Sequence, residues 1–168
     1  LIKDIRNNSF SLINFYERRA RRILPALFFL ILFCFPFVWY LMLPYQILEF
    51  ARSLKFVSLF ISNIFFWRAG GDGYFSGKID EMPLLHTWSL GIEEQFYLIF
   101  PLFLILIWKL NKRLILIFLI VILLISLCIS EWGWRNEPIA NFYITFSRAW
   151  ELLFGCIIAI LNFKKKFK

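Results

Sequence analysis

The sequence predicts an all-α membrane protein: a polytopic bundle of transmembrane helices with four full spans and one further helix that is interfacial, re-entrant or a fifth span. Three observations support this prediction. Of the 168 residues, 61% are hydrophobic and 18% are charged, whereas a soluble domain usually has roughly 45–50% apolar and about 25% charged residues. Long apolar segments recur along the chain, and basic residues gather at their ends.

The four predicted spans are apolar segments of helical length. They cover residues 23–43, 88–108, 114–130 and 139–161. A helix that crosses the hydrocarbon core needs about 17–25 apolar residues, and each segment falls in that range. Pro25 lies in the first turn of its span, where the missing N–H costs least, and Pro36 predicts a kink. We expect residues 1–168 to form one partial transmembrane domain.

The segment 47–67 is the fifth helix, and three charged residues interrupt its first half. Most of the lysines and arginines lie elsewhere, in the amino-terminal flank, in the 109–113 turn and in the tail. By the positive-inside rule, these groups share the cytoplasmic side only if residues 44–92 make no net crossing. We therefore favour four spans with an interfacial or re-entrant 47–67 helix, and a fifth span is the alternative.

The net charge of +8 is then a feature of the inner face that attracts anionic lipid, and it does not indicate a nucleic-acid partner. The three cysteines lie inside apolar runs, without the spacing of a disulfide framework or a metal site: Cys34, Cys128 and Cys156. We therefore expect no metal. The chain opens at Leu1 without an initiator methionine or a signal-peptide layout, so we expect it to be part of a longer product.

Four arginines lie within five positions directly before the first span: Arg18, Arg19, Arg21 and Arg22. A guanidinium can bind phosphate through two parallel hydrogen bonds, which a lysine ammonium cannot. Arg19 and Arg22 are three residues apart and would share a helix face. The cluster therefore predicts an anion-binding rim on the cytoplasmic side, although an orientation signal alone would also explain it.

A polar stripe is predicted at the start of the second span. Ser89, Glu93 and Tyr97 are spaced four and four, which places them along one side of a helix. A carboxylate at the centre of a span costs ~2.5–3.5 kcal/mol and usually marks a functional site. The alternative is that residues 93–95 only mark the water boundary. His86, the only histidine, lies just outside the span and titrates near physiological pH, but a lone histidine is more often structural.

The last span carries opposite charges near its middle. Arg148 and Glu151 are three residues apart, so they can pair and reduce each other's desolvation cost; a purely structural pair is the alternative. Gly155 and Ala159 form a small-residue face suited to close helix contact. In the four-span topology, Glu93, Arg148 and Glu151 occupy the outer half of the bundle, while the arginine cluster faces the cytoplasm.

At these clusters the sequence resembles the acyltransferase-3 family of membrane O-acyltransferases, which decorate surface glycans such as lipopolysaccharide O-antigen and peptidoglycan. Arg19-x-x-Arg22 resembles the family's cytoplasmic arginine motif, and Ser89-x-x-x-Glu93-x-x-x-Tyr97 resembles its serine–glutamate–tyrosine motif. The stretch 147–155 resembles a later family helix. Further features are similar to the branch that often carries an SGNH hydrolase-like domain: Asn63 with Phe66-Trp67, Tyr74-Phe75 and the stretch 83–90. The likeness covers about residues 10–160.

The resemblance implies an enzyme of the bacterial inner membrane that transfers an acyl group, expected to be acetyl, to a hydroxyl of a cell-surface glycan. Acyl-CoA is the expected donor substrate, with no bound cofactor, and the lipid bilayer is the other partner. Arg19 and Arg22, with Arg18 and Arg21, would bind the donor's phosphates. Six residues would form the catalytic side: Glu93, Ser89, Tyr97, His86, Arg148 and Glu151. Glu93 would orient a base or the acceptor, and Arg148 would stabilise negative charge at the acyl carbonyl.

The sequence also departs from the family pattern. The histidine proposed as the family's catalytic base lies on an amino-terminal helix, and no residue here matches it, although a base is needed to deprotonate the acceptor hydroxyl. The later spans and an SGNH domain are not found either. We therefore expect an N- and C-terminally truncated piece whose partners include those parts. A transporter or channel subunit and a non-catalytic remnant of a disrupted acyltransferase are the alternatives.

Overall fold

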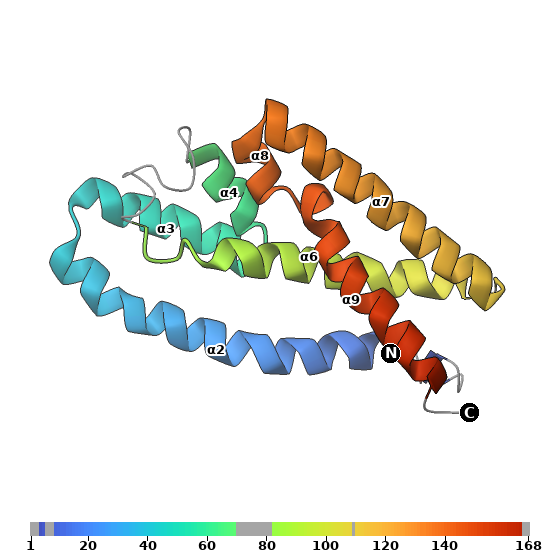
Figure 1. The fold of residues 1–168 in the computed structure, drawn as a ribbon. Coiled ribbons are helices and arrows are strands. Elements are labelled where there is room, and N and C mark those ends of the chain that lie inside the picture. Colours follow the sequence, from blue (N-terminus) through green and yellow to red (C-terminus); the bar gives the residue numbers. More distant parts are fainter. Residues whose placement is uncertain (1–3, 6–8, 70–81, 109, 166–168) are drawn as a thin grey trace.

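The computed structural model describes residues 4–5, 9–69, 82–108 and 110–165, and in this part the chain is helical with no strand (Figure 1). The main helices are α2 (Leu12–Leu41), α3 (Pro44–Ser58), α4 (Ser62–Ala69), α6 (Thr87–Ile107), α7 (Lys112–Asn136), α8 (Pro138–Tyr143) and α9 (Thr145–Lys165). Four stretches are long and apolar enough to span a membrane: Leu12–Leu41, Thr87–Ile107, Arg113–Asn136 and Pro138–Asn162. The prediction of an all-α bundle with four spanning helices is confirmed.

The helix α2 is longer than the span predicted for it. Ser11 caps its amino terminus by accepting a hydrogen bond from the backbone N–H of Asn14 at 3.4 Å. The arginine cluster therefore forms turns of the helix itself and is not a flank outside it. α2 continues through Pro25 and Pro36, and Figure 1 shows it curving toward its carboxyl end.

The segment 47–67 is divided between α3 and α4 by a tight turn at Phe60. Ile61 N–H donates to the Phe56 carbonyl at 2.9 Å, and Phe60 N–H donates to the Val57 carbonyl at 3.1 Å. This pair of bonds is the Schellman pattern, in which the residue after the helix is usually glycine. Phe60 takes that position with a φ of 55°, and a side chain in the left-handed region costs roughly 1–2 kcal/mol.

The two halves of this segment do not continue in one direction. Figure 1 shows α3 running from the end of α2 to the first half of α6, and α4 turning back from there. α3 has 15 residues and α4 has 8, and both are shorter than the about 17–25 residues that a span needs. The four stretches that are long and apolar enough to span do not include this segment, which supports four spans over five.

The helix α6 is the central element of the fold. Its first half packs with α3, α4 and α8 in one apolar cluster that includes Phe66, Trp88 and Tyr143. Its second half packs with α7 and α9 in another, around Leu104 and Leu119. In the most apolar part of α6, 39% of the residues are buried. The corresponding share is 11% in α2 and 17% in α7. Side chains on α6 can therefore reach several other helices.

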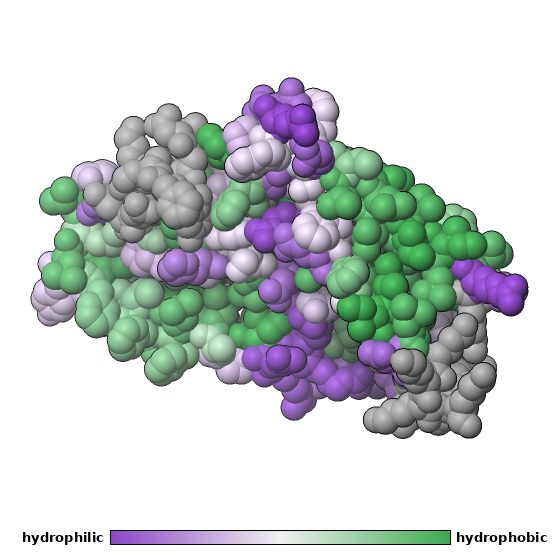
Figure 2. Space-filling view, viewed as in Figure 1, coloured by the Kyte–Doolittle hydropathy of each residue, from purple (hydrophilic) through white to green (hydrophobic). Residues whose placement is uncertain are grey.

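The outer sides of α2 and α7 are apolar and exposed. Phe28, Phe29 and Trp39 of α2 are 64%, 70% and 74% exposed. Figure 2 shows apolar residues over the visible sides of both helices, with a polar band between them. Large exposed apolar patches are rare on soluble monomers. On helices of this length they are suited to contact with lipid.

A serine of α7 makes two hydrogen bonds to the backbone of α9. The hydroxyl of Ser126 donates to the Phe146 carbonyl at 2.6 Å and accepts from the Trp150 N–H at 3.0 Å. The predicted small-residue face of α9 is not used in this contact. A Cβ added at Gly155 would meet no atom of the described chain within 4 Å, and Ala159 is exposed as well. The expectation of a close helix contact at this face is therefore not met among the described residues.

Candidate functional site

Three consecutive residues of α6 face three different neighbours. Successive residues of an α-helix are about 100° apart around its axis. Glu93 lines a pocket with α9, Glu94 pairs with Arg19 of α2, and Gln95 binds the turn between α3 and α4. Since Glu94 and Gln95 bind other segments, these two residues do more than mark a water boundary.

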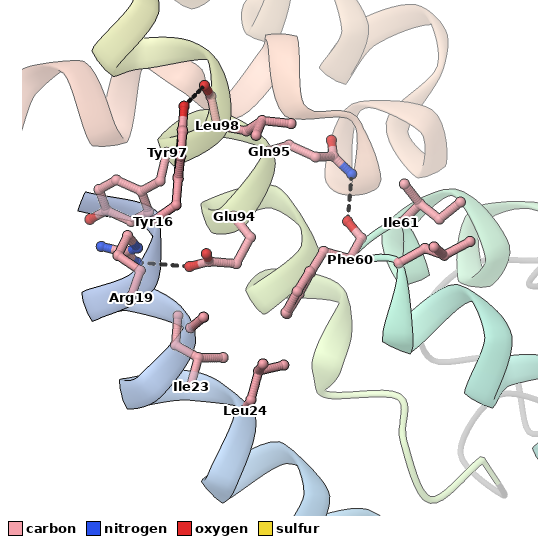
Figure 3. A pocket seen from close by; sticks show the side chains of 12 residues that line it. Tyr16, Arg19, Ile23, Leu24, Phe60, Ile61, Glu94, Gln95, Tyr97 and Leu98 are labelled. Atoms are coloured by element: carbon pink, nitrogen blue, oxygen red, sulfur yellow. Dashed lines mark hydrogen bonds and ion pairs between the residues drawn. The ribbon is translucent and has the colours of Figure 1, made fainter. Parts of the chain in front are cut away.

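The pocket between α2 and α6, which we call the Arg19 pocket, has a volume of about 340 Å³. Arg19 Nη2 donates to Glu94 Oε1 at 2.7 Å, and the two side chains are 22% and 14% exposed. The guanidinium carbon of Arg19 lies 3.4 Å from the centre of the Tyr97 ring, a cation–π contact. Tyr16 donates its hydroxyl proton to the Leu98 carbonyl at 2.7 Å. Figure 3 shows these side chains around the cavity.

The guanidinium of Arg19 is only partly satisfied. Its Nε is buried and has no acceptor among the residues that the structure describes. In Arg148 of the same chain, Nε and Nη2 both bind the carboxylate of Glu151. In Arg19 the same two nitrogens, Nε and Nη2, lie along one edge of the guanidinium, but only Nη2 binds a carboxylate, that of Glu94. An anion with two oxygens, such as a phosphate, matches the whole edge.

The remaining arginines of the cluster point away from this pocket. Arg18, Arg21 and Arg22 are exposed, and Arg21 pairs with Glu17 at 2.7 Å. The structure therefore places Arg19 alone of the four in the pocket. The predicted convergence of Arg19 and Arg22 on one site is not seen, because the intervening turn directs Arg22 to the surface of α2.

The pocket between α6 and α9, which we call the Glu93 pocket, has a volume of about 390 Å³. Its polar lining consists of Ser89, Glu93, Arg148 and Glu151. Arg148 donates to Glu151 through Nε and Nη2, both at 3.0 Å. Its guanidinium carbon also lies 5.0 Å from the Trp88 ring centre. The predicted ion pair of α9 is thus present, and it forms one wall of the pocket.

The carboxylate of Glu93 is the free charge of this pocket. It is exposed and makes no ion pair or hydrogen bond with any residue that the structure describes. Arg148 faces the same cavity but is clamped by Glu151. The pocket therefore combines a fixed cation with a carboxylate that can bind something else.

The predicted stripe of Ser89, Glu93 and Tyr97 is divided between the two pockets. Ser89 and Glu93 line the Glu93 pocket, whereas Tyr97 lies in the Arg19 pocket. The reason is geometric: each step of four residues turns by about 40° around the helix, so Tyr97 is about 80° from Ser89. His86 is exposed just before α6 and lines neither of these two pockets.

The sequence predicted that the arginine cluster and the Glu93 pocket lie in opposite halves of the bundle, and the structure does not separate them in this way. Arg19 lies beside Glu94, the neighbour of Glu93 in the chain. Because α2 begins at Leu12, its arginines lie alongside α6 and not below it. The two pockets therefore flank the same turn of α6, on different sides.

Sequence reasoning missed two groups of residues at this site. Glu94 was treated as a boundary residue, although a charged side chain that is buried on an apolar helix needs a partner. The second group is a polar network around Gln95, which contacts Phe60, Asn63 and Thr145. Nothing in local spacing shows this network, since its members come from distant segments. Among the described residues, no cluster of three histidine, cysteine or acidic side chains could hold a metal.

Comparisons with known proteins give a consistent result. The model of a family described as an acyltransferase domain matches residues 5–168. An uncharacterised protein of Haemophilus influenzae is 34% identical over 96% of this chain and 68% of its own length. The candidate peptidoglycan O-acetyltransferase YrhL of Bacillus subtilis is 33% identical over 88% of this chain, and the O-acetyltransferase OatA of Staphylococcus aureus is 32% identical over 93%.

The lengths of these relatives differ widely. The chain spans 24% of YrhL and 26% of OatA. No solved structure matches this chain.

Proposed function

This chain belongs to the acyltransferase-3 family, and we propose that it acts in transferring an acyl group from an acyl-CoA-type donor to a hydroxyl of a glycan at the surface of a bacterial cell. Two relatives are named O-acetyltransferases, and the name of one gives peptidoglycan as its substrate. These names favour acetyl as the acyl group and peptidoglycan as the glycan. The long apolar helices support a location in the cell membrane.

The observation that carries this proposal is the free Glu93 carboxylate opposite a clamped Arg148. Acyl transfer to an alcohol needs a group that holds and helps to deprotonate the attacking hydroxyl. It also needs a fixed positive group where negative charge develops on the carbonyl oxygen. Glu93 would orient the hydroxyl or the base that takes its proton. Arg148, fixed by Glu151 and by stacking over Trp88, would stabilise the carbonyl oxygen.

The Arg19 pocket would take the donor. The planar guanidinium of Arg19 suits a phosphate oxygen. The rest of the lining is largely apolar and includes Ile23, Leu24 and Phe60, which suits an extended thioester arm. In this proposal the donor lies in the Arg19 pocket and the acceptor in the Glu93 pocket, and α6 borders both.

The test uses the gene product that contains this chain, expressed in a bacterial host deleted for its own O-acetyltransferases. Membrane vesicles receive acetyl-CoA labelled in the acetyl group, and label is measured in purified glycan before and after mild alkali. We expect alkali-labile label that depends on the protein. Membranes that contain the protein but give no ester-linked label would contradict the proposal. Passage of a solute without acyl transfer would favour the transporter alternative.

A further inference from the structure

Gln95 of α6 has its amide bound on every side by protein. Its Nε2 donates to the Phe60 carbonyl at 3.0 Å and to Asn63 Oδ1 at 2.8 Å. Its Oε1 accepts a hydrogen bond from the Thr145 hydroxyl. A primary amide has two N–H donors, so both donors are in use. Gln95 borders the Arg19 pocket, and Figure 3 shows its bond to Phe60.

The first partner is the strained turn between α3 and α4. Phe60 has a φ of 55°, a conformation that a residue with a side chain keeps only where its surroundings enforce it. Its carbonyl, which follows the helix end, is satisfied by Gln95. The turn also lies directly on the backbone of α6, because a Cβ at Gly91 would be 3.2 Å from the Phe60 oxygen and from two side chains of α4. Gln95 thus holds the turn against α6.

The second set of partners lies at the break between α8 and α9. Asn63, which accepts from Gln95, donates its own Nδ2 to the Tyr143 carbonyl at 3.0 Å. Thr145 is the first residue of α9. One amide therefore connects the α3–α4 turn, α4 and the start of α9. The three contacted residues are 35, 32 and 50 residues away from Gln95 in the chain.

Each connection leads to a different pocket. Phe60 is a wall of the Arg19 pocket, and Thr145 precedes Arg148 of the Glu93 pocket by three residues on the same helix. We propose that Gln95 is a positioning residue that fixes the two pockets relative to each other, so that a donor in one can reach an acceptor in the other. This inference rests on the proposed function for its catalytic consequence, but the geometry that it asserts can be measured without activity.

The first experiment is kinetic and uses the full gene product in membranes. Gln95→Met removes all three hydrogen bonds and keeps the length of the side chain. We expect at least a tenfold loss of acyl transfer and a raised KM for acyl-CoA, at an unchanged amount of membrane-inserted protein. Thr145→Val removes only the link to α9, so we expect a lower kcat with the donor KM unchanged. Thr145→Ser keeps the hydroxyl and should remain within about twofold of the wild type, a difference of only ~0.4 kcal/mol in barrier.

The matched control is Gln46→Met, since Gln46 is the other glutamine of the chain and caps the start of α3. It should leave the donor KM unchanged. A Gln95→Met protein that loses activity only in proportion to its folded amount, with both KM values unchanged, would show a merely structural residue and overturn the proposal.

The second experiment measures the geometry directly. Spin labels are attached at Ser58 and Phe146, which are both exposed, in a protein whose native cysteines have been replaced, and their separation is measured by pulsed electron resonance. We expect Gln95→Met to broaden or shift the distance distribution, and Gln46→Met to leave it unchanged. An unaltered distribution in Gln95→Met would refute the positioning role even if the wild type transfers acyl groups. A wild type without acyl transfer would refute the proposed function and leave this measurement to decide on Gln95.

Discussion

Arg19 Nη2 lies 2.7 Å from Glu94 Oε1, and this contact joins the cluster of arginines on α2 to the polar turn of α6. In the sequence these residues belong to two separate motifs. In the structure they form one wall of a cavity, with the Tyr97 ring stacked on the guanidinium. The ion pair therefore separates the roles of four arginines that look equivalent in the sequence.

The first prediction contrasts two of these arginines. Arg19→Lys keeps the charge but loses the planar guanidinium that pairs with Glu94 and stacks on Tyr97. We expect it to raise the KM for acyl-CoA about tenfold. Arg22→Lys changes an exposed side chain and should alter the KM by no more than about twofold. The measurement is the donor dependence of glycan acylation in vesicles. Equal effects of the two substitutions would indicate that the cluster acts only through its charge.

The second prediction concerns Glu94→Gln, which removes the charged partner of Arg19. A hydrogen bond to a charged group contributes about 1.5–3 kcal/mol, so we expect a lower melting temperature in detergent. The freed guanidinium would then bind the phosphates of acyl-CoA more strongly. The donor should therefore raise the melting temperature of the variant by more than it raises that of the wild type. An equal shift in both proteins would show that the donor does not meet Arg19.

The third prediction concerns the neighbouring carboxylate. Glu93 has no ion pair among the described residues, so Glu93→Gln should leave the melting temperature unchanged, in contrast to Glu94→Gln. It should nevertheless lower acyl transfer at least tenfold, because the charge that orients the acceptor or its base is lost. Glu49→Gln, in an exposed ion pair with Arg52, is the control. Activity of Glu93→Gln within about twofold of the wild type would return Glu93 to the role of a boundary residue.

The fourth prediction tests the contact of the α3–α4 turn with α6. Gly91→Ala would place a Cβ 3.2 Å from the Phe60 carbonyl oxygen and from the side chains of Ser62 and Asn63. Overpacking of this kind costs about 1–3 kcal/mol, so the melting temperature should fall. Gly155→Ala is the matched control, because a Cβ there meets nothing within 4 Å of the described chain and alanine is the better helix former. A fall of equal size in both variants would place the effect in lipid contact, and not in the turn, because the gain in helix propensity would raise the melting temperature.

Much of the fold could be predicted from the sequence, because each spanning helix is specified locally by a long, mainly apolar stretch. The pairing of Arg148 with Glu151 was also predictable, since a spacing of three fixes the contact within one helix. The end of α3 was not, because a phenylalanine takes the position that glycine usually marks. Its carbonyl is bound by the distant side chain of Gln95.

The candidate site was predicted less completely, for a related reason. Spacing by four identified Ser89, Glu93 and Tyr97 as polar positions of one helix, but it does not say which helices surround them. Tyr97 is assigned to the Arg19 pocket by the position of α2, and only the tertiary structure supplies that. Glu94 stayed unnoticed for the same reason.

The orientation of residues 93–95 toward three neighbours has a consequence for the evolution of this helix. An insertion of one residue just before Ile92 would advance the phase of all that follows by about 100°. Glu93 would then arrive opposite Arg19, and the ion pair would survive. Ile92 would replace the carboxylate beside Arg148, while Glu94 would meet the carbonyl oxygen of Phe60, acceptor against acceptor. A point substitution in this turn changes one contact, whereas a change of its length would exchange the partners of all three residues at once, and only Arg19 would still face a carboxylate.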